Sequence, residues 1–273
     1  MIRIDYPDPT DQRWVDWKRR AEEKLKELRA YADLMAAAEY EGFAAPEIVD
    51  SLYKYPREWL MEAFNGKCAF CESRMDAQQP GDVEHFRPKR EVHNDDGGDA
   101  QFATSTGTLR KHPGYFWLAY EWSNLLLACN TCNRSAKRSF FPIENAAERA
   151  SRPSAIAKER ALLINPREED PAPFLRFEDT GMVIPIGPRG EKCEKMLNLN
   201  RDALVDERKQ TYKNVKDSYE KYMSLKETDP ESVLYKTELE EYHAGKRKFA
   251  AQARVAMANA RAELEKKLKR LGF

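Results

Sequence analysis

The sequence lacks any long run of apolar residues, at its N-terminus or elsewhere. A helix that spans a bilayer needs roughly 20 predominantly apolar residues, and no stretch of the 273 residues approaches that length. The first residues, MIRIDYPDPTDQRW, contain three aspartates and no apolar segment of the kind that a secretory signal requires. We therefore expect a cytoplasmic protein with no membrane partner.

The sequence also lacks an excess of charge of either sign. It has 46 basic and 46 acidic residues, whereas a protein that binds nucleic acid by itself usually accumulates cations. With 41% hydrophobic and 34% charged residues, the composition is typical of a soluble globular protein with long polar helices. Any nucleic-acid site must be local, and a neutral chain of this kind can depend on a partner for much of its affinity for a polyanion.

Cysteines are few, but four of the five form two Cys-x-x-Cys pairs. Cys68 and Cys71 lie in KCAFCES, and Cys129 and Cys132 lie in LACNTCNRS. Each pair can supply two thiolates from one tight turn, and zinc prefers four such ligands in a tetrahedron. The alternatives are unrelated buried cysteines or a redox dithiol, but the spacing favours a structural zinc site. Cys193 stands alone and is expected to be a buried or idle thiol.

Apolar periodicity divides the chain into four regions. Spacings of three and four predict a helix over residues 11–40, and a second helical stretch begins near Pro46, breaks near Pro56 and ends at Asn65-Gly66. A β-hairpin is predicted around Asp179-Thr180-Gly181, and the remainder is helical. We expect an N-terminal helical region (1–60), a zinc-stapled core (61–142), a connecting region with the hairpin (143–195) and a helical C-terminal region (196–273).

The segment between the two cysteine pairs predicts a compact unit of two strands and one helix. The buried run LLLA after Asn124 is expected to pair antiparallel with DVEHF, and a helix is expected to begin near Thr131. Asn133 and Lys137 are four residues apart, so they would share one helical face. Because adjacent strand residues point to opposite faces, Glu84 and His85 can face one site only if the strand ends or bulges there.

These polar residues have the chemistry needed to hydrolyse a phosphodiester. Magnesium or manganese needs few protein ligands, so the Glu84 carboxylate and the Asn133 amide oxygen suffice. A neutral His85 can take a proton from water, and the metal can stabilise the leaving oxygen. We expect the neighbouring cations to contact phosphates: Arg87, Lys89, Arg90, Arg134 and Arg138. The other histidines, His93, His112 and His243, are expected to be structural or exposed to solvent.

The motif CAFC…VEHFRPK…NLLLACNTCNRSAK resembles the HNH endonuclease family. The resemblance implies an α+β, mostly helical chain built on a ββα-metal core with a four-cysteine zinc site. It implies His85 as general base, Glu84 and Asn133 as ligands of a catalytic metal, and Asn124 as the residue that orients His85 or braces the hairpin. Many family members have aspartate where this chain has Glu84, so Asp82, on the same strand face, is an alternative ligand.

Further stretches, including GYFWLAYEWSNLLLACNTCNR and LLINPREEDPAPFLRFEDTG, resemble the HNH-nuclease subunits of Septu-type phage defence and their retron-associated relatives. That resemblance implies an ABC-like ATPase partner and an endonuclease that is the effector of a two-component defence complex. The sequence does not decide between DNA and RNA as the substrate, and we favour DNA. We expect the C-terminal helices to bind the partner. Two alternatives remain open: a zinc-stapled nucleic-acid-binding or adaptor module with an inactive centre, and a dithiol redox protein.

Overall fold

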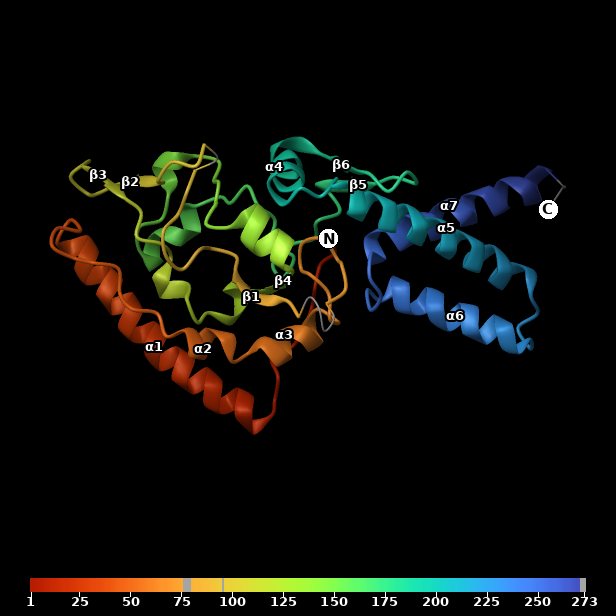
Figure 1. Ribbon diagram of the computed structural model, residues 1–273, viewed down its shortest axis with the longest axis horizontal. Coiled ribbons are helices and arrows are strands. Elements are labelled where there is room, and N and C mark those ends of the chain that lie inside the picture. Colours follow the sequence, from red (N-terminus) through yellow and green to blue (C-terminus); the bar gives the residue numbers. More distant parts are fainter. Residues whose placement is uncertain (76–79, 95, 271–273) are drawn as a thin grey trace.

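The computed structural model describes residues 1–75, 80–94 and 96–270, and its helices and short strands form an α+β fold (Figure 1). Helix α1 (Gln12–Ala37) lies along one edge of the molecule. The Asp11 side chain caps it by accepting a hydrogen bond from the Trp14 amide, 3.0 Å away. The buried face of α1 carries apolar residues at spacings of three and four, as predicted: Trp14, Trp17, Ala21, Leu25, Leu28, Ala32 and Met35.

Two short helices follow, α2 (Asp50–Lys54) and α3 (Arg57–Ala63), and the predicted break at Pro56 separates them. Asn65 and Gly66 both have positive φ angles, 51° and 63°, which ends the helical stretch where the sequence predicted. The first cysteine follows two residues later. Both helices contact β1 (Asp82–His85), so they form one wall beside the central hairpin.

The central hairpin pairs β1 with β4 (Leu125–Ala128) antiparallel, as predicted. Glu84 lies opposite Leu126 and His85 lies opposite Leu125. All four β4 residues are fully buried, so this strand forms part of the main core. The helix after it, η3 (Thr131–Lys137), is a π-helix rather than an α-helix, with the Arg138 amide bonded to the Asn133 carbonyl five residues back.

A second hairpin, which was not predicted, lies between β1 and β4 in the sequence. It consists of β2 (Gln101–Ala103) and β3 (Leu109–Lys111). Two 3-10 turns, η1 (Phe116–Leu118) and η2 (Trp122–Asn124), then lead the chain back to β4. These elements occupy the 38 residues that separate His85 from Asn124.

The connecting region contains two 3-10 turns, η4 (Ala146–Glu148) and η5 (Pro153–Lys158), and the predicted hairpin of β5 (Leu175–Phe177) and β6 (Val183–Pro185). Gly181 in the hairpin turn has a φ of 85°, and a Cβ there would lie 2.2 Å from the Val205 carbonyl oxygen. Glycine is therefore required at this contact with the C-terminal helices. Helix α4 (Gly187–Leu197) follows β6 and contacts η3.

Three helices form the C-terminal lobe: α5 (Asp202–Ser224), α6 (Pro230–His243) and α7 (Ala250–Arg270) (Figure 1). They enclose a small second core that includes Val215, Leu239 and Tyr242. The long periodic stretch after Pro230 is two helices rather than one, because the chain turns at Gly245, whose φ is 75°. No helix in the described part of the chain is both long and apolar enough to cross a membrane.

Candidate functional site

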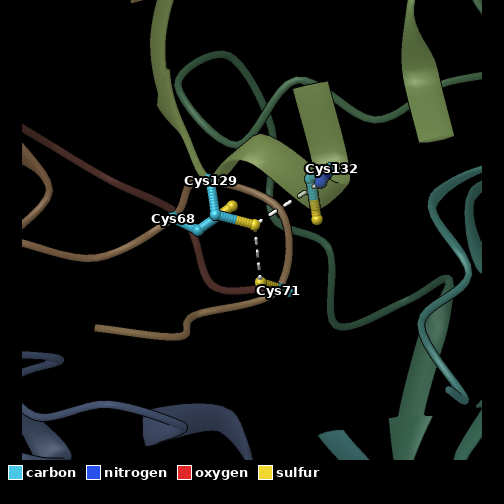
Figure 2. Close-up of side chains that lie close together, drawn as sticks. All are labelled: Cys68, Cys71, Cys129 and Cys132. Atoms are coloured by element: carbon cyan, nitrogen blue, oxygen red, sulfur yellow. Dashed lines mark hydrogen bonds between the residues drawn. The ribbon is translucent and has the colours of Figure 1, made fainter. Parts of the chain in front are cut away.

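The four paired cysteines converge although 57 residues separate the two pairs (Figure 2). The sulfur atoms of Cys68, Cys71, Cys129 and Cys132 all lie within 4.8 Å of one another, and all four side chains are buried. A zinc ion with Zn–S bonds of about 2.3 Å would set the sulfurs about 3.8 Å apart. The Cys71 and Cys129 sulfurs are 3.8 Å apart. The cluster can therefore hold a metal such as zinc.

Hydrogen bonds from backbone amides hold the two Cys-x-x-Cys turns in place without a metal. The Cys132 amide donates to the Cys129 sulfur at 3.4 Å, which closes the second turn. The Ala69 amide donates to the Leu127 carbonyl at 2.8 Å, which brings the first turn against the end of β4. Cys193 lies elsewhere, where its sulfur accepts a hydrogen bond from the Ile164 amide and burial raises its pKa to about 12. Cys193 is buried, as predicted.

Arg201, the residue before α5, connects the C-terminal lobe to the cysteine cluster. Both of its terminal nitrogens lie 3.9 Å from the Cys132 sulfur. The same guanidinium donates to the Leu197 and Asn198 carbonyls at the end of α4. A cation at this place offsets the negative charge that thiolate ligands carry.

Glu84 and Lys137 form a buried ion pair at the end of β1. The Lys137 ammonium lies 2.7 Å from Glu84 Oε1 and also donates to the His85 carbonyl at 3.0 Å. Burial raises the pKa of the Glu84 carboxyl, and the Lys137 charge opposes that rise. Lys137 is fully buried. Its ammonium thus holds one oxygen of Glu84 and the backbone of His85 in a fixed relation.

The His85 imidazole is held at one nitrogen. Nε2 lies 2.9 Å from the Ala119 carbonyl oxygen, and because a carbonyl only accepts, Nε2 carries the hydrogen. The lone pair of the neutral ring is therefore on Nδ1. The Tyr53 ring contacts the imidazole at 71°, with centroids 4.8 Å apart. Burial, aided by the Lys89 charge, lowers the pKa of His85 to about 3, so the ring is neutral at physiological pH.

Glu84 and His85 nonetheless face one cleft, because β1 ends at His85 and the constraint on neighbouring strand residues no longer applies there. Asn133 lies on the same cleft, so the structure brings these three predicted residues together. The cleft is lined mainly by polar and charged side chains: Tyr53, Lys54, Arg57, Asp82, Glu84, His85, Lys89, Arg90, Glu91, Asn133, Arg134, Arg138 and Ser139.

Asn124 braces the chain that leaves β1. Its Oδ1 accepts a hydrogen bond from the Arg87 amide at 2.8 Å, and its Nδ2 donates to the Arg87 and Leu118 carbonyls at 3.1 and 3.2 Å. These bonds hold the segment after His85 against the turn that carries Ala119. In the described part of the chain Asn124 has no hydrogen bond to the His85 side chain, so its geometry favours the bracing role.

The predicted phosphate-binding cations lie in different settings. Arg87 does not line the cleft, because its Nε donates to the buried Glu159 at 3.0 Å and its guanidinium packs against Phe86 and Phe141. Arg134 lines the cleft and pairs with Asp82 at 2.9 Å. Nε and Nη2 of Arg134 both contact Oδ2 of Asp82, the carboxylate considered as the alternative metal ligand.

Lys89, Arg90 and Arg138 also line the cleft. The wall opposite η3 comes from α2 and α3, which the sequence analysis placed outside the core. Tyr53 and Lys54 lie on α2, and Arg57 begins α3. The only signal in the sequence was an aromatic residue followed by cations in SLYKYPR, and that pattern is common on solvated helices.

Two known proteins are similar to this chain. Septu protein PtuB of Bacillus mycoides (strain KBAB4) is 42% identical over 158 residues, which cover 57% of this chain and 50% of PtuB. Septu protein PtuA of the same organism is 31% identical over 206 residues, which cover 72% of this chain and 27% of PtuA. The chain is thus homologous to Septu proteins but spans half the length of one and about a quarter of the other. It matches no family profile and no solved structure.

Proposed function

We propose that this chain is the nuclease component of a Septu-type anti-phage defence system and that the cleft at the end of β1 is an HNH-type active site for phosphodiester hydrolysis. One observation supports this most strongly. A neutral histidine with its hydrogen on Nε2 shares a polar cleft with a carboxylate and an amide, Glu84 and Asn133. The homology to PtuB and PtuA supports the defence role.

In this proposal His85 is the general base. Its Nδ1 takes a proton from the attacking water, and Ala119 and Tyr53 keep the ring in place. Glu84 and Asn133 would hold a magnesium or manganese ion, since carboxylate and amide oxygens are the ligands that these ions prefer. Lys137 binds one oxygen of Glu84, and the second oxygen would be available to the metal. The ion would supply charge stabilisation at the phosphoryl group.

The cysteine cluster has a structural role in the same proposal. A zinc ion bound by Cys68, Cys71, Cys129 and Cys132 would fix both ends of the 57-residue segment that contains β1 and the second hairpin. The cleft cations Lys89, Arg90, Arg134 and Arg138 would contact the phosphates of the nucleic acid. DNA is the expected substrate over RNA.

A different function is supported by one observation, the ion pair of Glu84 with Lys137. The Lys137 ammonium weakens the buried Glu84 carboxylate as a metal ligand. A nucleic-acid-binding module with an inactive centre would have such a pair. Incubation of the full chain with plasmid, single-stranded DNA and RNA separates the two functions. Each assay is run with and without the ATPase partner. The nuclease proposal expects cleavage in at least one of these assays, and that cleavage should require Mg²⁺ or Mn²⁺. Binding without cleavage in every condition would favour the inactive module.

We also propose that the C-terminal lobe binds an ABC-like ATPase. The chain has no net charge, and α6 exposes Val233 and Leu234 with 58% and 70% of their surface accessible. Leu234→Glu in the full chain should reduce co-purification with the ATPase. The matched control is Leu109→Glu on β3, since Leu109 is also 65% exposed. If both variants retain the ATPase as the wild type does, the docking surface lies elsewhere.

A further inference from the structure

Lys89 differs from the other cations around the cleft because it is both half-buried and without a hydrogen-bond acceptor in the described part of the chain. The Arg138 side chain also has no hydrogen bond or ion pair with the described residues, but it is exposed. Lys54 pairs with Asp50 at 2.9 Å, Arg134 with Asp82 at 2.9 Å, and Lys137 with Glu84 at 2.7 Å. Lys89 is half-buried, yet its ammonium has no hydrogen bond or ion pair with any residue that the structure describes. Its contact is with the Tyr53 ring, whose centroid lies 4.2 Å from Nζ.

The Tyr53 ring contacts both Lys89 and His85. The Lys89 ammonium lies over the ring, and the His85 imidazole meets it at 71° with centroids 4.8 Å apart. Tyr53 is only 6% exposed, so the ring cannot move without disturbing the core. One aromatic side chain therefore sets the position of the unpaired cation relative to the expected base.

The electrostatics of the cleft favour an anion beside Lys89. Burial lowers the pKa of the Lys89 ammonium, while Asp50 and Glu84 act at longer range to keep it charged. A partly desolvated cation without a hydrogen-bond acceptor is costly unless a ligand supplies one. A phosphate oxygen is the acceptor expected in a cleft of this composition.

We propose that Lys89 is a catalytic residue and not only a nucleic-acid contact: its ammonium binds a non-bridging oxygen of the scissile phosphate. Tyr53 is the positioning residue that holds Lys89 and His85 in one arrangement. This inference rests on the proposed nuclease function. Water attacks phosphorus, its proton passes to His85 Nδ1, the P–O bond to the leaving oxygen breaks, and that oxygen takes a proton from solvent. Lys89 stabilises the negative charge that builds up on the non-bridging oxygen.

Single-turnover cleavage at saturating substrate, measured beside binding affinity, tests the role of Lys89. Lys89→Met should lower the saturating rate by about 10²- to 10³-fold, the usual effect of removing a donor that stabilises transition-state charge. Its affinity for nucleic acid should fall by less than about tenfold, the equivalent of one lost phosphate contact. The matched control is Lys111→Met, since Lys111 lies on β3 and pairs with Asp99 at 2.9 Å.

A merely structural role is tested by rescue. Added ethylammonium should restore part of the rate of Lys89→Ala, and zinc content should match the wild type. Tyr53→Leu should slow cleavage by up to about 10²-fold through misplacement of the two groups. Tyr53→Phe, which keeps the ring, should cleave faster than Tyr53→Leu.

Three outcomes overturn the inference. In the first, Lys89→Met weakens binding but keeps the saturating rate, which makes Lys89 a binding contact only. In the second, ethylammonium fails to rescue a well-folded Lys89→Ala. In the third, the wild-type chain cleaves no nucleic acid under any condition, which overturns the proposed function as well. An active wild type with a fully active Lys89→Met overturns the role of Lys89 alone.

Discussion

Two buried histidines, one at the end of β1 and one directly after β3, differ in the hydrogen bonding of a single ring nitrogen, Nδ1. His85 and His112 are 4% and 0% exposed, and burial lowers the pKa of each to about 3. Each donates from Nε2 to a backbone carbonyl, His85 to Ala119 at 2.9 Å and His112 to Ala150 at 2.8 Å. The two imidazoles are therefore equivalent in the direction of the pKa shift and in the hydrogen bond that Nε2 donates.

The second nitrogen separates them. Nδ1 of His112 accepts a hydrogen bond from the Gly114 amide at 3.0 Å, and aromatic rings surround this imidazole. Nδ1 of His85 has no such donor in residues 1–75, 80–94 and 96–270, and His85 lines the cleft. A lowered pKa is therefore shared by a structural and a candidate catalytic histidine, and the second nitrogen distinguishes them.

The largest effect should come from removing zinc from the four-cysteine cluster. The chain around both histidines should then unfold, so that neither keeps the hydrogen bonds that distinguish it. Zinc bound by four thiolates contributes on the order of 10 kcal/mol to folding. We expect about one zinc per chain, and Cys129→Ser should lose it together with cooperative unfolding. Elemental analysis and thermal unfolding check this. The control is Cys193→Ser, which should keep its zinc. Clearly less than about one zinc in the wild-type chain, or an unchanged zinc content in Cys129→Ser, would contradict the site.

The next largest effect should separate the two histidines by activity. His85→Ala should lower the cleavage rate by about 10²- to 10⁴-fold, as expected for a general base. Zinc content and the unfolding midpoint should stay close to wild type. Undiminished cleavage by a folded His85→Ala protein would show that the open nitrogen has no catalytic role.

His112→Ala should show the opposite pattern. It leaves the Gly114 amide and the Ala150 carbonyl without partners, at a cost of about 1–3 kcal/mol for each buried group. Urea unfolding should show this loss, while the cleavage rate per folded molecule stays near wild type. His243→Ala is the control, because His243 is exposed. A stable His112→Ala protein would mean that its two hydrogen bonds do not stabilise the fold.

The smallest effect should appear as a pH dependence of stability. The pKa of His112 is about 3 in the folded chain and about 6.5 when unfolded, so the unfolded state binds more protons between these values. The contribution of His112 is fully present above about pH 6.5 and falls as pH falls toward 3, with a slope of up to about 1.4 kcal/mol per pH unit. His112→Gln should reduce this slope in urea unfolding from pH 7 to 4.5, and an unchanged slope would contradict it.

Local spacing predicted the parts of the site that depend on neighbouring residues. The Cys-x-x-Cys turns and the helix end at Asn65-Gly66 follow from residues within a few positions. The β1–β4 pairing joins distant segments, but each strand shows its own local signal, and the cysteine pairs beside them indicate that they meet. The second hairpin was missed because its strands have only three residues each, too short for an alternating pattern. The turn at Gly245 was missed because the charged pattern continues on both sides.

The long-range partners of individual polar and aromatic side chains were not predictable from the sequence. Arg87 was expected to contact phosphate, but Glu159, 72 residues away, binds it. Tyr53 and His85 meet only because α2 packs on β1. The π-helix η3 also changes the expected geometry, since Lys137 turns inward to Glu84 while Asn133 stays on the cleft. The roles of Glu84, His85 and Asn133 in catalysis stay predictions.

The four residues of β4 separate two fixed points, Asn124 before the strand and Cys129 after it. One braces the candidate active site and the other belongs to the cysteine cluster. Inserting or deleting one residue between them would turn the later side chains of the strand to the opposite face and shift Cys129 relative to Asn124. Evolution can therefore exchange Leu125, Leu126 or Leu127 for other apolar residues of similar volume, while insertions and deletions in this strand should be eliminated. Among relatives of this chain, we expect the interval from asparagine to cysteine to vary less than the residues that fill it.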